Sequence, residues 1–212
     1  MNGNTRSDWK SNWRSQKRKG LLDAVVSVVA RSGIENLTMD NVALEAGVSK
    51  GTLYAYFKNK QDLFRAAIDA SIAPLVCELK AVLTTGLPPD IRIRNMIQRH
   101  LAYFEENRNF FQILIHDRMA AQARLRRYKS DRYQDWLNAT SRVIEEGIRH
   151  GLFRAADSNK TAAVLIEANI AIINQRLLCE TPGPVQDDAN LLAETFLFGI
   201  AAEGYRKRRA HS

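Results

Sequence analysis

Apolar residues recur every three to four positions along most of this chain, the spacing that gathers side chains on one face of an α-helix. The valine-rich run at 25–29 comes nearest to a strand, but Leu21, Val25 and Val28 share one helical face. With 212 residues, 45% of them hydrophobic, the chain is long enough to bury a real core. An all-α fold is therefore predicted.

Glycine, proline and capping residues divide this pattern into segments. We expect helices at about 16–31, 38–46, 49–57, 59–84, 91–106, 109–120, 125–150, 160–180 and 187–207. The expected domains are a basic arm at 1–15, a three-helix head within 16–64 and a larger helical body at 65–212.

The net charge of +8 is concentrated near the two ends of the chain. Residues 1–20 carry six basic side chains and one acidic, and residues 206–209 are all basic, whereas basic and acidic residues balance between 65 and 205. A basic arm beside a small helical domain is typical of a polyanion-binding protein. Trp9 and Trp13 lie in this arm, which can be a solvated segment or one that becomes helical on DNA.

The segment 38–57 has the residue types that a helix-turn-helix requires. Ala43 is small where two helices must cross, and Gly47 allows a sharp turn because glycine accepts positive φ without steric cost. On a helical wheel Leu53 and Phe57 fall within about 40° of each other and face inward. The opposite arc carries Gly51 and hydroxyl groups, as suits a helix that enters the major groove.

This segment closely resembles the TetR family of regulators. The resemblance is carried by Thr38, Val42-Ala43, the run from Ala46 to Tyr54, Tyr56-Phe57, Lys60 and Leu63-Phe64. It implies about nine helices, with an N-terminal DNA-binding domain and a C-terminal domain for ligand binding and dimerisation. The residues implied or expected to contact DNA are Thr38, Ser49, Lys50, Gly51, Thr52, Tyr54, Tyr56 and Lys60.

The resemblance also implies a function. We expect a ligand-responsive transcriptional regulator, most often a repressor in this family, that binds a palindromic double-stranded DNA operator as a homodimer. A small-molecule effector would release it. Activation instead of repression stays open, and an architectural DNA-binding protein without sequence preference is the rival reading.

The segments 160–180 and 187–207 are apolar on more than one face, so each must bury several sides. One stripe runs through Ala163, Ile166, Ile170, Ile173 and Leu177, and another through Leu192, Phe196, Gly199 and Ile200. In TetR-like proteins the equivalent helices pair with their copies. We therefore expect the homodimer interface here.

An effector pocket would need aromatic walls and a few polar groups. The candidates are Tyr103, Phe104, Phe111, His116, Tyr133, Trp136, Asn169 and Ile173. Core packing or another structural role is the commoner explanation for residues of this kind. The basic run 124–129 is typical of a solvated helix face, with an anionic effector as the alternative.

Other classes of protein lack support in the sequence. No nucleophile elbow, phosphate-binding glycine loop or zinc-protease motif is present, and the two cysteines and four histidines have no metal-ligand spacing. We expect no enzyme activity, no cofactor and no metal. Cys77 and Cys179 are expected to be small buried residues. Without a signal peptide or an apolar span, a cytoplasmic, nucleoid-associated protein is predicted.

Overall fold

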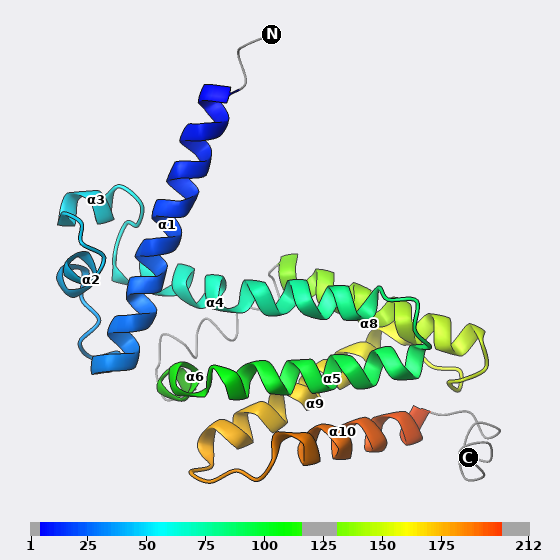
Figure 1. The fold of residues 1–212 in the computed structure, drawn as a ribbon. Helices are drawn as coiled ribbons and strands as arrows, with labels where there is room; N and C mark the ends of the chain where they lie inside the picture. Colours follow the sequence, from blue (N-terminus) through cyan, green and yellow to red (C-terminus); the bar gives the residue numbers. More distant parts are fainter. Residues whose placement is uncertain (1–4, 116–130, 201–212) are drawn as a thin grey trace. The chain divides into compact units, whose positions relative to one another are not determined.

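A computed structural model describes residues 5–115 and 131–200, and these residues contain helices but no strand. The nine described helices are α1 (Thr5–Ser32), α2 (Met39–Glu45), α3 (Lys50–Tyr54), α4 (Lys60–Leu83), α5 (Pro89–Glu106), α6 (Arg108–Ile115), α8 (Asp131–Arg149), α9 (Ser158–Leu178) and α10 (Val185–Ile200) (Figure 1). The all-α prediction is confirmed.

Contacts divide the described chain into two compact units. The first contains residues 5–72 and 112–115, and the second contains 73–111 and 131–200. The division falls within α4, and each unit has its own core.

In the first unit, α1, α2 and α3 bury their apolar faces together. Val25 and Val28 of α1, Val42 of α2 and Leu53 of α3 are all fully buried. Two glycines with positive φ, Gly33 and Gly47, close α1 and turn the chain between α2 and α3. These contacts fix the short third helix, which at five residues could not be stable alone.

The first helix differs from the prediction, because it begins at Thr5 and not near Gln16. The sequence from Thr5 to Lys19 contains no proline or glycine, and adding a residue to an existing helix costs far less than starting one. The packed turns after Leu21 therefore provide the nucleus for a longer helix. The sequence pattern missed this because residues 5–20 carry no apolar stripe.

In the second unit α5 packs against α8, α9 and α10, and α8 packs against α9. Their shared core includes Ile93 and Met96 of α5, Ile144 of α8 and Leu165 of α9. Arg176, near the end of α9, is buried and pairs with Glu105 (Nη2 to Oε2, 3.0 Å) and with Asp188. This network holds the ends of three helices, α5, α9 and α10, together.

By length and composition α9 is the one described helix that could cross a membrane. It also buries Asn169 and the paired Arg176, and it packs against three other helices. These features indicate a core helix. The two cysteines correct another expectation: Cys77 and Cys179 are both exposed. Cys77 lies on the outer side of α4, and Cys179 follows the last turn of α9.

Candidate nucleic-acid interface and effector site

Side-chain caps define the beginnings of α2 and α3. The Thr38 hydroxyl accepts a hydrogen bond from the backbone N–H of Asn41 at 3.1 Å, and the Ser49 hydroxyl accepts one from Thr52 N–H at 3.1 Å. Each bond satisfies a donor that the helix itself leaves unpaired. Between the helices, Gly47 has φ of 63° and Val48 N–H donates to the Ala43 carbonyl at 2.9 Å. Thr38 and Ser49 thus build the helix-turn-helix, whatever else they contact.

The inner side of this motif is packed as the helical wheel predicts. Leu53 and Phe57 are buried, and both lie against a core that includes Val42 and Ala43. Arg31 and Glu45 add an ion pair of 2.8 Å between α1 and α2 at the surface. The orientation of α3 is therefore set by its buried side.

The opposite side of α3 faces outward. Lys50, Gly51 and Tyr54 are exposed, whereas Thr52 and Tyr56 are half-buried. The Ser49 and Thr52 hydroxyl oxygens lie 2.9 Å apart, so one donates to the other and both groups stay at the surface. Hydroxyl and ammonium groups on one exposed helix can donate hydrogen bonds to phosphate oxygens and to the acceptor atoms of base edges.

Gly51 has no structural need to be glycine. Its φ is not positive, and a Cβ added there would meet only the Ser49 hydroxyl, at an ordinary 3.9 Å. The missing side chain therefore leaves open space on the outer face of α3. Such space allows a second molecule to approach the backbone closely.

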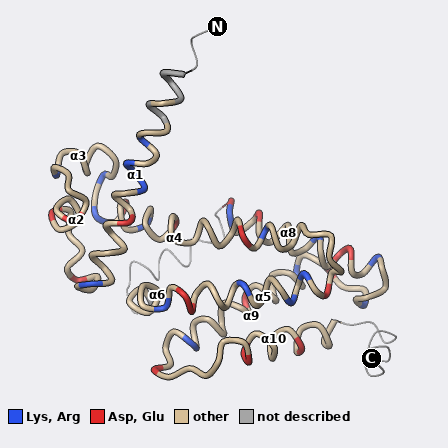
Figure 2. Tube along the Cα trace, viewed as in Figure 1, with Lys and Arg blue, Asp and Glu red and all other residues tan. Residues whose placement is uncertain are grey.

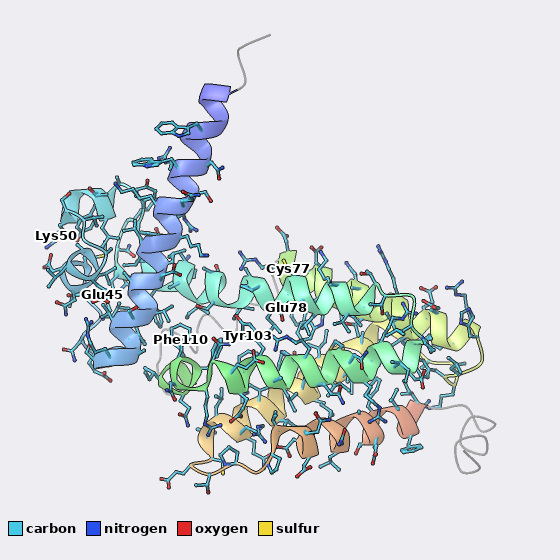
Figure 3. All side chains as sticks on the ribbon, viewed as in Figure 1. Glu45, Lys50, Cys77, Glu78, Tyr103 and Phe110 are labelled. Atoms are coloured by element: carbon cyan, nitrogen blue, oxygen red, sulfur yellow. The ribbon has the colours of Figure 1, made fainter. Side chains whose placement is uncertain are left out.

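Lys50 lies at the edge of α2 and α3 that is opposite α1 (Figure 3) and forms an ion pair with Asp40 of α2 at 2.8 Å. Its hydrogen bond to the Asp40 carboxylate raises the pKa of the exposed Lys50 ammonium. In the free protein this cation already has a partner. A phosphate that binds Lys50 must compete with Asp40.

Lys60 is the first residue of α4 and is half-buried. Two hydrogen bonds fix the beginning of this helix. Asn59 Oδ1 accepts one from Asp62 N–H at 2.9 Å, and Asp62 Oδ2 accepts the other from Lys58 N–H at 3.1 Å. Lys60 therefore has a fixed position just after the motif. The structure thus collects all eight predicted DNA-contacting residues in the first unit.

The predicted effector residues form a chain of aromatic contacts in the second unit. Phe104 lies 4.4 Å from Phe111 and 6.1 Å from Tyr103 between ring centroids, and Trp136 lies 6.5 Å from Tyr133. Figure 3 labels Tyr103 on α5. Ile173 is buried on α9, and His116 and the basic run 124–129 lie outside the described residues.

His100, which the sequence analysis did not single out, connects these two aromatic groups. Its ring lies 5.5 Å from Phe104 and 4.8 Å from Trp136, each time edge-on. Its neighbours Met96, Ile97 and Leu101 are all apolar core residues. A histidine among apolar residues at helical spacing is the sequence pattern that could have indicated a buried polar group here.

Three buried polar atoms in this region, His100 Nδ1, Trp136 Nε1 and Asn169 Oδ1, have no hydrogen bond of good geometry, although the His100 and Asn169 side chains are close enough to interact. The Asn169 amide donates its other end to the Leu165 carbonyl at 2.8 Å, which fixes the orientation of the side chain. Burial lowers the pKa of His100 to about 4, although Asn169 acts in the opposite direction. The imidazole is therefore neutral at pH 7. Buried polar atoms without partners are uncommon and mark a place where a ligand group or water can bind.

No group of three His, Cys, Asp or Glu side chains within residues 5–115 and 131–200 is arranged to hold a metal ion. The charges of the second unit serve its packing, as the pairs of Arg176 and the contact of Lys80 with Asp135 at 2.9 Å illustrate. Basic and acidic positions alternate along α8 (Figure 2). The chemistry available here is binding, by apolar walls with a few neutral polar groups.

Comparison with known proteins agrees with this geometry. Residues 21–67 match the family described as bacterial regulatory proteins, tetR family. An HTH-type transcriptional regulator of Bacillus subtilis, YhgD, is 29% identical over 165 residues, covering 74% of this chain and 82% of that protein. The repressor KstR of Mycobacterium tuberculosis is 30% identical over 91 residues, which cover 43% of this chain and 41% of that protein.

The fold also matches solved structures. The regulator FadR of Bacillus subtilis, solved in complex with stearoyl-CoA, superposes with a TM-score of 0.70 at 19% identity, covering 86% of this chain and 98% of that one. These relatives are regulators and not enzymes, which agrees with the sequence-based expectation. Residues 21–67 thus carry the DNA-binding domain of the tetR family, and the chain is a helix-turn-helix transcriptional regulator similar to the proteins of that family.

Proposed function

We propose that this protein is a ligand-responsive repressor that binds a palindromic operator as a homodimer and leaves it when an effector binds. Residues 16–64 would contact DNA, and residues 65–212 would bind the effector and the second copy. The outer face of α3 carries the proposal. Its small centre at Gly51, flanked by exposed donors on a rigidly packed helix, fits the floor and walls of a major groove.

Each predicted contact has a distinct role in this arrangement. Thr52 lies beside Gly51, where it can reach a base edge, and Lys50, Tyr54 and Tyr56 can donate to phosphates on the groove walls. Thr38, Ser49 and Lys60 lie at helix beginnings, where backbone N–H groups also favour an anion.

The dimer is supported by apolar side chains that the single chain leaves in contact with water. Val164 and Leu178 of α9 are 64% and 57% exposed, and Leu191 and Phe198 of α10 are 63% and 44% exposed. The stripes named from the sequence instead include residues that the chain itself buries, such as Ile166, Ile173 and Leu192. The two helices therefore have apolar side chains both inside and outside, as an interface between copies requires.

For the effector we propose a long apolar molecule with one polar group, such as an acyl thioester. The aromatic chain from Phe111 to Tyr133 supplies apolar walls, and the unpaired atoms of His100, Trp136 and Asn169 supply neutral polar partners. The stearoyl-CoA complex of the FadR relative is consistent with this class. Binding must favour a protein conformation with lower DNA affinity, because only a difference in affinity between two states can shift their populations.

A footprint on the DNA upstream of the protein's own gene tests the DNA-binding proposal. A regulator of this kind, acting in the cytoplasm at the nucleoid, protects two half-sites about 34–36 Å apart, one helical turn. Its affinity exceeds that for random duplex by about 10³ or more at the same salt concentration. Equal affinity for both duplexes would instead identify an architectural protein.

Adding stearoyl-CoA to the footprinted complex, with coenzyme A and stearate as separate controls, tests the effector proposal. Release by the thioester alone supports a neutral acyl group as the recognised feature. Release by stearate alone would keep the long apolar chain but assign the recognised polar group to a free carboxylate, and release by coenzyme A alone would contradict the proposal. Transcription in vitro from the same promoter, with and without the protein, distinguishes repression from activation.

A further inference from the structure

The first turns of α1 contribute no buried side chain to the core of the described chain. None of the described side chains before Leu21 is buried, and the helix nevertheless begins at Thr5. At 1.5 Å per residue, the segment 5–20 is about 24 Å long. We call this segment the α1 extension.

The α1 extension is strongly basic, with six basic residues and one acidic residue in its sequence. Among its described side chains, Arg14, Arg18 and Lys19 are exposed and Lys17 is half-buried, and the ion pairs among described residues include none of these four. Figure 2 shows these basic positions on α1. Arg14 and Arg18 are four residues apart on one helical face, where like charges disfavour the helix. Such a cluster is stabilised by an external polyanion.

Two contacts connect the α1 extension to the end of the recognition motif. The Arg14 guanidinium carbon lies 5.9 Å from the centre of the Tyr56 ring, and that of Arg18 lies 5.3 Å from the centre of the Phe57 ring. Cation–π contacts of this kind hold the guanidinium planes in place. Because Tyr56 is a proposed phosphate contact, Arg14 lies next to the phosphates that α3 would meet.

Two tryptophans lie on the same segment. Trp9 and Trp13 are 65% and 51% exposed, and Lys17 lies over the Trp13 ring at 4.8 Å from its centre. Indole rings at the surface are costly in water and gain from being covered by another molecule. Trp136, the third tryptophan, is buried in the second unit.

We propose that the α1 extension is a second DNA-binding element, which contacts the phosphate backbone beside the groove that α3 enters and covers Trp9 and Trp13 with the duplex. It rests on the proposed DNA-binding function. The extension supplies affinity and not sequence preference, since phosphates carry no sequence information. The contact of Arg14 with Tyr56, a proposed phosphate contact, favours DNA over an acidic protein or a lipid surface as the occupant.

The test measures the salt dependence of DNA binding by the full-length protein. Fluorescence anisotropy gives Kd for a labelled 40-base-pair duplex of mixed sequence between 50 and 200 mM NaCl. Each phosphate contact contributes about 0.9 to the slope of log K against log salt. The variant with Arg14→Ala and Lys17→Ala should therefore lose about 1.8 in slope for each α1 extension bound.

A matched control removes two exposed charges from α8, Arg142→Ala with Arg149→Ala. This variant has the same net charge but should keep the wild-type slope. Urea unfolding curves check that both variants are folded. Equal slopes for the two variants would overturn the proposal, because the salt dependence would then reflect only the number of charges removed and not their position on α1.

Acrylamide quenching of tryptophan fluorescence gives an independent readout. Saturating duplex should lower the quenching constant of the wild type, and Trp9→Phe with Trp13→Phe should abolish that change. Unprotected tryptophans on DNA, or protection by anionic vesicles of phosphatidylglycerol without protection by DNA, would contradict the proposal. If the wild type fails to bind the duplex even at 50 mM NaCl, the DNA-binding function itself fails. If the wild type binds the duplex but the α1 substitutions change neither the salt dependence nor the tryptophan protection, this inference alone fails.

Discussion

Lys50 illustrates how a single residue can carry both a structural and a functional interaction. Its ammonium group pairs with Asp40 at 2.8 Å, although both side chains are largely exposed. An exposed pair of this kind contributes little to folding stability. In the proposed complex with DNA the main effect of the pair is on binding, since Asp40 would compete with a phosphate for Lys50 and would place a negative charge beside the DNA.

Replacing Asp40 by asparagine should therefore strengthen DNA binding. We expect Kd for duplex DNA to fall by about threefold to tenfold at 50 mM salt, because the change removes both a competing partner of Lys50 and a nearby repulsion, each of which is weak at an exposed position. Fluorescence anisotropy measures the change. Asp69→Asn on α4 removes an equal charge elsewhere in the first unit and should have a smaller effect. Weaker binding by Asp40→Asn would mean that Asp40 positions Lys50 for DNA.

His100 should make folding stability depend on pH. Its pKa is about 4 in the folded chain, below the 6.5 of an exposed histidine, so the folded state prefers the neutral ring. The contribution is complete above pH 6.5 and is lost as the pH falls toward 4, because only the unfolded chain takes up the proton in that range. The full shift corresponds to about 3 kcal/mol.

Urea unfolding at pH 7.0 and pH 4.5 checks this prediction. Between these pH values the wild type should lose about 2–3 kcal/mol more than His100→Gln, which removes the titrating group. His150→Gln, at an exposed position, serves as the control and should behave like the wild type. An identical loss for wild type and His100→Gln would show that His100 titrates normally.

At this scale, sequence could predict residues whose roles are local. The caps at Thr38 and Ser49 and the inward side of Leu53 follow from spacing alone, because they involve neighbours within one or two turns. The pairing of Lys50 with Asp40, and the meeting of His100 with Trp136 and Asn169, depend on how separate helices pack. One sequence without tertiary contacts contains no signal for these.

Among the elements, the turn after α8 depends on the absence of a side chain at Gly147. A Cβ added there would overlap the buried ring of Phe153. The Gly147 carbonyl also accepts hydrogen bonds from Leu152 N–H at 2.9 Å and Phe153 N–H at 3.1 Å, which fold the chain back at the end of the helix. The ring and the helix backbone thus occupy adjoining space with no room for a methyl group.

Gly147→Ala should therefore destabilise the protein by about 1–3 kcal/mol, the range for overpacking a core. Gly20→Ala is the matched control within α1. Nothing lies within 4 Å of a Cβ added at Gly20, so this change should stabilise the helix by about 0.5–1 kcal/mol. Thermal unfolding followed by circular dichroism measures both. Wild-type stability for Gly147→Ala would mean that Phe153 repacks without cost.

The helices themselves were largely predictable, since amphipathic periodicity, caps and breakers are encoded locally. Predicted and observed bounds differ by at most two residues for α2, α5 and α9. The beginning of α1 was not predictable in this way. Residues 5–20 form a helix because they extend the packed part of α1. A polar segment of this kind has no apolar face, so its sequence shows no helical period of hydrophobic residues.

For the whole molecule, the proposed function requires that two copies of the chain place their α3 helices at one fixed spacing. Sequence periodicity could not distinguish the exposed apolar side chains of α9 and α10 from the buried ones. Both sets follow the same helical period, and only the packing against α5 and α8 shows which face is already buried. Exposure, and not hydrophobicity, therefore distinguishes the faces of α9 and α10 that another molecule can cover.

The double substitution Leu191→Arg with Val164→Arg should separate the proposed dimer, because each arginine would place a charge in an apolar interface. Light scattering after size-exclusion chromatography should show the mass of one chain, 24.0 kDa, for this variant and twice that for the wild type. DNA affinity should fall with it, since one α3 alone reads one half-site. Leu87→Arg, exposed in the connection before α5, is the control and should stay dimeric. A wild-type mass for the double variant would place the interface on other helices, and α9 and α10 would then need another partner for their outer faces.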